Sequence, residues 1–523
     1  MKSYDIVFIS PSFAPVLKEE SIGTLILAKK AKLAGYNVDV LRYWESNNFS
    51  MSNYLGFREN FVELILQKDP IIVSFYCRCT DYHVNVDLAK HIKDRSPNIK
   101  IVFGGPQSEL VSIQTLRNFE FIDYVACSEG ENTIIPLINC IINKKNHQDS
   151  IPGLCYRNDN GDIVQNKFPQ LLPNDYKREY MYYDLIPSSI VRNSKSLTLD
   201  VGRGCPYSCT FCSTKTFWKQ QFRLRDIDDI DDMIKEMKWL VLNYGISKFD
   251  FDHDMFTVNK GKLRRFCDAI KENGLSIRWY CSSRLDTIVP KDIDYMYDAG
   301  MTNILYGVET GSQRMQKIIN KNLNLSKSRE IVKYTVSKGI KAKMSFMYGF
   351  PEETEADFEE TLRLMYDFLK LGAHIVVWRC GILNGTAMYE KHKGELFLSD
   401  YDWKNYSFFG YKENKSMVKD WPEVFPQFYD HPNPLRKRLI YFDLFFSLWK
   451  DFSRNEFDTI ANSFLETGRR LLDLYDAFVA SNETLLTGYT PVSSDKYWNF
   501  SENECHILIE NFVNYVKSYH QKK

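Results

Sequence analysis

Three cysteines stand close together in the run Cys205-Pro-Tyr-Ser-Cys209-Thr-Phe-Cys212. Thiolates are the usual ligands of iron–sulfur clusters, which normally take four of them. No fourth cysteine is close, because the nearest ones are Cys155 and Cys267. A cluster held by three cysteines keeps one iron open to a chelating ligand, much as a catalytic zinc ion keeps one position open. The spacing therefore predicts a [4Fe–4S] cluster with three protein ligands.

A zinc knuckle is the structural alternative for these cysteines. Zinc would want four ligands, typically from paired CxxC motifs or a nearby histidine, and neither accompanies residues 205–212. The chain holds 12 cysteines, and Asp5 interrupts the apolar run at its start, which is not typical of a signal peptide. We therefore expect a reducing, cytoplasmic setting with metal ligands or free thiols rather than disulfides.

The composition argues against several other classes of protein. The 523 residues carry 67 basic and 67 acidic side chains, so the formal net charge is zero, and 44% are apolar. A binder of nucleic acid or anionic membranes would usually show a basic excess. The longest apolar stretches, such as 71–77, fall far short of a membrane-spanning helix. We expect a folded protein with no nucleic-acid partner and no membrane segment.

Strands and helices alternate over residues 1–150. Continuous apolar strands separated by helices indicate a parallel sheet that is covered on both faces. Such sheets bind ligands beyond the carboxyl ends of their strands. The predicted strands are 6–9, 38–41, 71–75, 101–103 and 122–126, and the predicted helices include 25–33, 84–92 and 133–142. Residues 151–195 break this rhythm with a small hairpin around Asn160-Gly161, and they predict an interdomain linker.

A second series of alternating strands and helices predicts a partial (β/α)6 barrel over residues 196–385, with its site at the carboxyl ends of the strands. Its clearest helix begins after Thr354 as N-cap and ends at Gly372. The predicted strands are 197–201, 249–252, 277–281, 304–308, 343–348 and 375–378. Residues 386–523 read as a helical, aromatic region that includes a long helical stretch at 436–485. We expect its helices to cap the barrel mouth.

The cysteine motif in the loop after the first strand of a predicted βα barrel resembles the signature of radical S-adenosylmethionine (SAM) enzymes. An aromatic residue before the third cysteine, here Phe211, is also typical of that family. The resemblance implies that SAM chelates the open iron. It also implies that reduction of the cluster cleaves SAM to a 5′-deoxyadenosyl radical, which abstracts a hydrogen from the substrate.

Other strand ends carry features that are similar to SAM contacts of this family. The resemblance assigns Met347 and Gly349, within Ser345-Phe-Met-Tyr-Gly-Phe-Pro-Glu352, to the adenine. It assigns Glu309 to the ribose and Arg284 to the carboxylate of SAM, a role that suits a guanidinium fork.

The usual Gly-Gly-Glu after the second strand is absent, and Asp250-Phe-Asp252-His253-Asp254 stands in its place. Asp252 and Asp254 are our candidates for the SAM amino group and for a catalytic role. An EF-hand calcium loop does not fit, because Met255 and Gly261 occupy the positions that need glycine and glutamate. Ordinary salt-bridge partners at a strand end remain an open alternative.

The first domain resembles the Rossmann-like, cobalamin-binding domain of one radical SAM subclass. The Asp-x-His-x-x-Gly motif that supplies a histidine to cobalt is missing, as is often the case in that subclass. Tyr76 or Arg78 would then lie below the corrin ring. The alternative is an empty scaffold. The resemblance assigns these residues to cobalamin: Gly23, Ser74, Tyr76, Gly104, Gly105, Gln107, Glu129 and Gly130.

This subclass most commonly transfers a methyl group to an unreactive carbon or a phosphorus. The resemblance implies a peptide or small-molecule substrate and an external electron donor such as flavodoxin or ferredoxin. Two rival hypotheses stay open. One is radical chemistry without methyl transfer, such as cyclisation, ring contraction, epimerisation or C–C bond formation. The other is an iron–sulfur or cobalamin-responsive binding protein without turnover.

Overall fold

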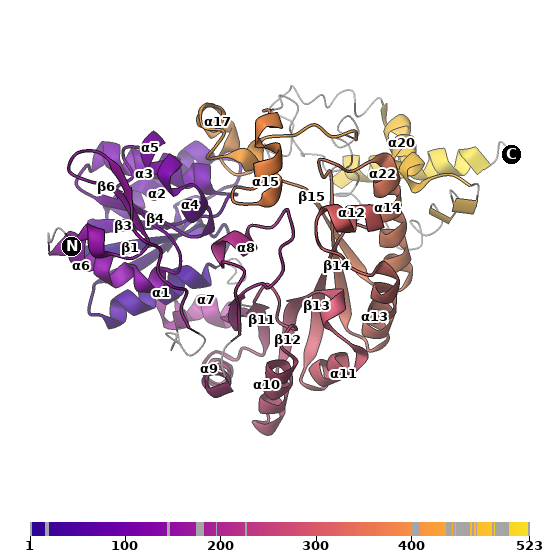
Figure 1. Ribbon diagram of the computed structural model, residues 1–523, viewed down its shortest axis with the longest axis horizontal. Coiled ribbons are helices and arrows are strands. Elements are labelled where there is room, and N and C mark those ends of the chain that lie inside the picture. The colour runs from indigo at the N-terminus through magenta and orange to yellow at the C-terminus, as the bar shows by residue number, and fades with distance from the viewer. Residues whose placement is uncertain are drawn as a thin grey trace.

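The computed structural model describes most of the chain (Figure 1). The described residues are 3–15, 20–143, 147–173, 182–194, 196–224, 227–398, 408–435, 442, 445, 461, 462, 465, 466, 468–483, 486 and 502–520. Two sheets organise them. The first lies in the N-terminal third and the second in the middle of the chain.

The first sheet has the strand order β2-β1-β3-β4-β5-β6-β7. Strands β1 to β5 run parallel, as predicted for a doubly wound sheet. Ile6 and Phe8 pack with α1 and α6 on one face, whereas Val7 and Ile9 pack with α2 and α3 on the other. The elements are β1 (Tyr4–Ser10), α1 (Ile22–Leu33), β2 (Val38–Arg42), α2 (Tyr54–Leu66), β3 (Pro70–Tyr76), α3 (Tyr82–Arg95), β4 (Lys100–Gly104), α4 (Pro106–Leu110), α5 (Ser112–Asn118), β5 (Tyr124–Ala126) and α6 (Ile134–Ile142).

The hairpin expected in a linker belongs to the first sheet. β6 (Leu154–Arg157) pairs antiparallel with β5, and β7 (Ile163–Gln165) pairs antiparallel with β6. The buried side chains of Leu154 and Cys155 explain this placement, because they continue the apolar core of the domain. Residues 151–165 are therefore an edge of the sheet rather than a free connection.

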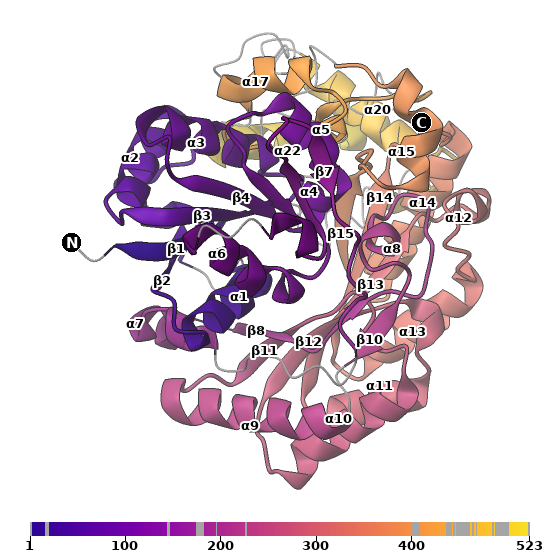
Figure 2. The same cartoon turned by 60° about the vertical axis from the view of Figure 1, so that its left-hand side comes forward.

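The second sheet has the order β15-β14-β13-β12-β11-β8, with all neighbours parallel. Its helices lie along the outer side, and its inner side turns towards the first domain (Figure 2). This is the predicted partial barrel. The elements are β8 (Leu197–Asp200), α9 (Ile227–Tyr244), β11 (Lys248–Asp252), α10 (Lys260–Glu272), β12 (Arg278–Ser283), α11 (Pro290–Asp298), β13 (Met301–Glu309), α12 (Gln313–Ile318), α13 (Leu325–Ser337), β14 (Lys341–Tyr348), α14 (Glu355–Lys370) and β15 (His374–Arg379).

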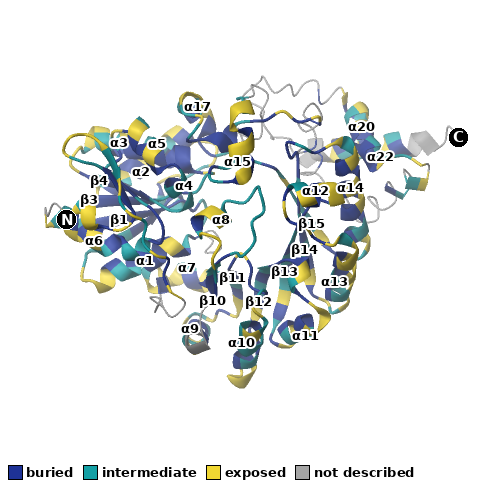
Figure 3. Ribbon diagram, viewed as in Figure 1, coloured by how far each residue is buried: buried dark blue, intermediate teal, exposed yellow. Residues whose placement is uncertain are grey.

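Alternate residues of the barrel strands differ sharply in burial. On β14, Met344 and Phe346 are fully buried against the outer helices, whereas Lys343, Ser345 and Met347 on the inner face are only half-buried. The alternation is visible as mixed colours along the barrel strands in Figure 3. Trp378 of β15 pairs in register with Met347 of β14 and is 60% exposed. The inner face of this sheet is therefore open to a ligand.

The described helices that follow the barrel pack in different places. α15 (Ala387–His392) lies against the cysteine loop, where the Met388 N–H donates to the Thr210 carbonyl at 2.9 Å, whereas later helices pack elsewhere. α17 (Tyr411–Asp420) packs against α3 of the first domain, and the fully buried Phe425 and Phe428 join the core of that domain. α20 (Leu471–Ser481) packs between α14 and α22 (Glu502–His520), outside the barrel. The aromatic side chains of this segment are typical of a core, but sequence alone does not indicate which surface covers them. Most of the predicted helical stretch 436–485 lies outside the described residues.

Helix α14 illustrates how local sequence determines an element. Thr354 caps its N-terminus: the Thr354 hydroxyl accepts the backbone N–H of Asp357 at 3.3 Å, and the Asp357 carboxylate accepts the N–H of Thr354 at 2.9 Å. This reciprocal capping satisfies two backbone donors at the start of the helix.

Among the described residues, no helix is both long and apolar enough to cross a membrane.

Candidate functional site

The three motif cysteines lie in a loop that is closed by a small antiparallel ribbon. β9 (Gly202–Gly204) precedes the loop and β10 (Phe222–Leu224) follows it. Cys205, Cys209 and Cys212 are all partly exposed. In the part of the chain that the structure describes, no three His, Cys, Asp or Glu side chains converge on a position for a single metal ion. A cuboidal cluster takes its thiolates on separate irons, so the loop can offer its cysteines without such convergence.

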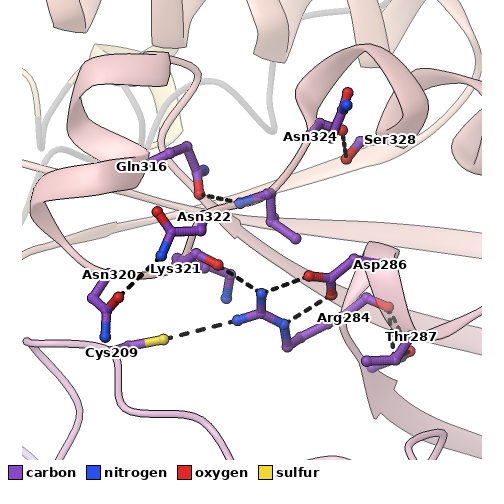
Figure 4. Close-up of polar contacts among 12 residues, drawn as sticks. Cys209, Arg284, Asp286, Thr287, Gln316, Asn320, Lys321, Asn322, Asn324 and Ser328 are labelled. Atoms are coloured by element: carbon purple, nitrogen blue, oxygen red, sulfur yellow. Dashed lines mark hydrogen bonds and ion pairs between the residues drawn. The ribbon is translucent and has the colours of Figure 1, made fainter.

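Arg284 lies beside the cysteine loop (Figure 4). One guanidinium nitrogen approaches Cys209 Sγ at 3.9 Å, and the group stacks on the Tyr207 ring at 3.9 Å from its centroid. The other two nitrogens donate to Asp286 at 2.7 and 2.9 Å, and one of these also donates to the Lys321 carbonyl at 2.7 Å. The guanidinium expected to bind the SAM carboxylate thus already holds an internal carboxylate and borders the cysteine sulfur.

A turn after α12 anchors the same loop. Asn320 Nδ2 donates to the carbonyl and hydroxyl oxygens of Ser208, both at 3.0 Å. Thr210 N–H donates to the Ile319 carbonyl at 3.0 Å. Asn320 and Asn322 adopt positive φ angles of 52° and 57°, a conformation that asparagine tolerates better than other side chains. The barrel thereby holds the cysteine loop through hydrogen bonds to Ser208 and Thr210, in addition to the β9–β10 ribbon.

Burial raises the pKa of the Cys205 thiol to about 11 and also raises that of Cys212. Partly buried thiols of this kind ionise readily only when a nearby positive charge stabilises the thiolate. An iron–sulfur cluster supplies that charge through its irons. Three thiols on one loop, with an arginine beside one of them, fit the predicted cluster.

The end of β14 forms a tight turn around a buried carboxylate. Gly349 has φ +77°, and its N–H donates to Glu353 Oε2 at 2.6 Å. Glu353 is fully buried, and burial raises its pKa to about 8. Phe350 meets Phe211 of the cysteine loop, with ring centroids 6.1 Å apart. Met347 packs in the same small apolar cluster. The turn assigned to adenine therefore contacts the cysteine loop directly.

Glu309, assigned to the ribose, lies at an irregular end of β13. Its φ is +69°, and the register with β14 shifts between Gly307 and Glu309. Its carboxylate pairs with Lys321 Nζ at 2.9 Å, and both side chains are at least nine-tenths buried. A non-glycine residue in this conformation stores strain, which is typical of ligand-binding positions.

The two aspartates proposed for the SAM amino group lie at and just after the end of β11. Asp252 pairs in register with Asp200 of β8, and its side chain lies outside the description. Asp254 faces the cleft between the domains, where desolvation raises its pKa although a hydrogen bond from the Gly204 backbone opposes the rise. The Asp250 carboxylate accepts a hydrogen bond from Ser196 Oγ at 2.9 Å.

A large cleft separates the carboxyl ends of the first sheet from the cysteine loop. It encloses about 1270 Å³ of empty space, open solvent at its mouth included. One wall comes from the first domain and the other from the barrel, including Asp254 and the Trp218 ring. Of the residues assigned to cobalamin, those that line the cleft are Gly23, Ser74, Tyr76, Gly104, Gly105, Glu129 and Gly130.

The glycines of this cleft fit a bulky ligand for different reasons. A Cβ on Gly23 would meet nothing within 4 Å, so this position faces open space. Gly105 has φ +96°, and a Cβ there would lie 3.0 Å from the Cys77 carbonyl oxygen. A Cβ on Gly130 would lie 2.7 Å from the Leu27 side chain. Backbone lines the cleft at these places, as a flat macrocycle or its nucleotide tail requires.

Gln107, which the sequence assigned to cobalamin, is not among the residues that line the cleft. Its amide donates to Asn384 Oδ1 and to the Val424 carbonyl, both at 3.0 Å, and its side chain is buried. Gln107 instead joins the first domain to the segment that follows the barrel. The two alternative candidates for the position below cobalt differ in their surroundings: Tyr76 lines the cleft, whereas Arg78 donates to Asp81 at 2.8 Å.

Glu129 has a second role besides lining the cleft. Its carboxylate pairs with Arg203 at 2.7 Å and with Arg223 at 2.9 Å, across the boundary between the domains. Neither arginine was a sequence candidate, and the same is true of Asp286, Lys321 and Glu353. Arg203 lies two residues before the first motif cysteine, and that proximity was the one signal that could have found it.

Two family models match the chain in succession. The B12 binding domain matches residues 15–137, and the radical SAM superfamily matches residues 199–365. An uncharacterized methyltransferase of Pyrococcus horikoshii is 30% identical over 307 residues, which are 58% of this chain and 66% of that protein. An anaerobic magnesium-protoporphyrin IX monomethyl ester cyclase of Synechocystis is 29% identical over 287 residues, which are 54% and 56% of the two chains. The chain thus spans less than two thirds of either relative.

The cobalamin-dependent S-adenosylmethionine radical enzyme OxsB, solved with aqua-cobalamin and S-adenosylmethionine, has a similar fold. The TM-score is 0.67 over 99% of this chain and 80% of that one, at 14% sequence identity. The likeness extends through the first sheet, the partial barrel and the helices that follow. Residues 15–137 thus match a B12 binding domain and residues 199–365 match the radical SAM superfamily, in the same order as the two sheets of the fold.

Proposed function

We propose that this protein is a cobalamin-dependent radical SAM enzyme that methylates an unactivated carbon of a peptide or small molecule. One observation carries the proposal: the cleft at the carboxyl ends of the B12-binding domain opens directly onto the barrel wall beside the cysteine loop. A corrin in the cleft and a cluster on the loop would then face one space. The methyltransferase name of the Pyrococcus relative favours methyl transfer.

When bound, the cluster and SAM supply a radical that abstracts hydrogen, and cobalamin supplies a transferable methyl group. The chain's own residues place these groups. Cys205, Cys209 and Cys212 would hold the cluster, Met347 and Gly349 the adenine, and Glu309 the ribose. Asp254, which faces the cleft, would hold the amino group of SAM. Arg284 would orient the cysteine loop through Cys209.

The open inner face of the barrel offers a place for the substrate. Lys343 lies over the Tyr280 ring at 5.4 Å from its centroid, and Trp378 is largely exposed on the neighbouring strand. Such side chains provide both charge and flat apolar surface for recognition. An external flavodoxin or ferredoxin would supply the electron, and we propose a cytoplasmic location.

The first experiment is anaerobic reconstitution with iron, sulfide and hydroxocobalamin, followed by desalting and metal analysis. The proposal expects about four irons, the content of a [4Fe–4S] cluster, and about one cobalt per chain. With dithionite and SAM, the enzyme should release 5′-deoxyadenosine. Cys205→Ala should abolish that release, whereas Cys267→Ala, on the outer helix α10, should not. Deoxyadenosine formation by Cys205→Ala would contradict the cluster assignment.

Methyl transfer itself is tested with SAM that carries a deuterated methyl group. Extracts of the source cells, freed of large proteins, supply substrates, and mass spectrometry detects products that gain the label. A labelled product supports methylation. Cleavage of SAM with a changed but unlabelled product would favour radical chemistry without methyl transfer, as the cyclase relatives suggest. Iron without cobalt would indicate an empty first domain.

A further inference from the structure

Two arginines stand directly opposite each other on the ribbon that closes the cysteine loop. Arg203 of β9 pairs in register with Arg223 of β10. Like charges facing each other across two strands destabilise the pairing. Glu129 lies between them, since its Oε1 accepts from Arg203 at 2.7 Å and its Oε2 from Arg223 at 2.9 Å. The carboxylate that bridges the two arginines therefore comes from the other domain, whereas Asp200 of the barrel approaches only Arg203, at 3.4 Å.

A second carboxylate strengthens this connection. Glu131 accepts from Arg203 at 2.6 Å, and the side chains of Glu129 and Glu131 are only 1% and 5% exposed. Burial by itself would raise the pKa of Glu129, but hydrogen bonding and charge from Arg223 and Arg203 lower it below its usual value. Both guanidinium groups also face the Trp218 ring, at 5.9 and 5.4 Å from its centroid. Desolvated, charge-assisted hydrogen bonds of this kind are the strong ones.

These ion pairs lie between the cysteine loop and the cleft. Arg203 lies two residues before Cys205, and β10 follows the end of the cysteine loop. Glu129 and Glu131 come just after β5, and both line the cleft. The ion pairs thus join the base of the cysteine loop to the wall of the cleft.

We infer that Glu129, Glu131, Arg203 and Arg223 form an interdomain clasp that sets the position of the cysteine loop relative to the cleft. They are positioning residues. The clasp itself stands on the contacts above, and its meaning for two cofactors rests on the proposed function. If the clasp opens, radical formation and methyl transfer lose their common geometry, because a shift of about 1 Å can cost roughly a hundredfold in rate.

Hydrogen exchange of the cofactor-free full chain tests the clasp independently of the proposed function. Glu129→Gln should speed exchange in residues 203–224 by about tenfold or more, since removing one partner leaves the other buried charges uncompensated. Glu20→Gln is the matched control, because Glu20 forms a similarly buried pair with Arg42 at 2.5 Å within the first domain. It should speed exchange around β2 and leave 203–224 unchanged.

Equal effects of both variants on residues 203–224, or no effect of Glu129→Gln there, would overturn the inference. Glu131→Gln provides the milder variant if Glu129→Gln does not fold, and it should produce a smaller rise in the same segment. In the reconstituted enzyme, Glu131→Gln should keep its iron and its SAM cleavage while the ratio of labelled product to deoxyadenosine falls. An unchanged ratio together with unchanged exchange would also contradict the clasp.

Discussion

The two sheets of this protein bury their faces differently. β1 of the first sheet is buried over its last five residues, because helices cover both faces, whereas β14 alternates between buried and half-buried residues. The first sheet can therefore bind a ligand only through the loops at the ends of its strands. The barrel sheet presents strand ends and also a whole open face. Under the proposed function, cobalamin and the substrate would therefore be recognised by different kinds of surface.

The largest expected change in the free energy of unfolding tests this comparison at two adjacent residues of β14. Phe346 is fully buried on the outer face, and its ring lies 6.1 Å from that of Phe368. Phe346→Ala should lower the free energy of unfolding by about 3–5 kcal/mol, as for other large-to-small changes in a core. Ser345→Ala, on the open inner face, should change it by less than about 0.5 kcal/mol.

Urea unfolding followed by circular dichroism measures both variants under the same anaerobic conditions. Similar losses from the two substitutions would mean that the inner face is packed rather than open. Strand propensity spans only about 1 kcal/mol between residue types, so it cannot account for a contrast of about 3–5 kcal/mol.

Buried ionisable groups extend the comparison to pH, and Glu353 of the barrel gives the larger effect. Its folded-state pKa of about 8 lies above the ordinary value of 4.5, so the folded protein holds a proton that the unfolded chain releases. Stability should therefore fall as pH rises from 4.5 towards 8, by on the order of a few kcal/mol. Glu353→Gln should flatten this slope, whereas Glu355→Gln, on the exposed start of α14, should preserve it. A Tm series across pH measures this.

His83 of the first domain gives the opposite and smaller dependence. Burial lowers its pKa to about 4, and its Nε2 lies 2.8 Å from the Phe409 carbonyl oxygen. The unfolded chain binds a proton near pH 6.5 that the folded chain refuses, so stability should fall as pH drops from 6.5 towards 4. His83→Gln should reduce that loss, and His147→Gln, on an exposed residue, should not. If the Tm difference between the full-length wild type and His83→Gln stays constant between pH 6.5 and 4, this prediction is contradicted.

Local sequence signals predicted the sheets well. Apolar runs located β3 and β4 within a residue or two, and Thr354 was found as the cap of α14. These features depend on residues close in sequence. The hairpin at 154–165 was also recognised, but its pairing with β5 was not, because an edge strand carries no mark of the strand beside it.

The candidate site was predictable only in part. Cys205 and its neighbours were found from their spacing, and Gly23 and Gly105 line the cleft to which they were assigned. Gln107 turned out to contact Val424, more than 300 residues away. Long-range partners of this kind, like the one between Glu129 and Arg203, follow from the packing of two domains and leave no local pattern.

The segment 408–435 belongs to the last part of the chain by sequence and to the first domain by packing. Gln427 donates to the Cys79 carbonyl at 2.7 Å, and the Phe428 ring lies 5.0 Å from that of His83. A gene fragment that encodes only the first domain would therefore leave this apolar surface bare. Residues 1–170 should become a soluble, autonomous unit only when residues 408–435 are supplied as well, in the same polypeptide or as a separate peptide.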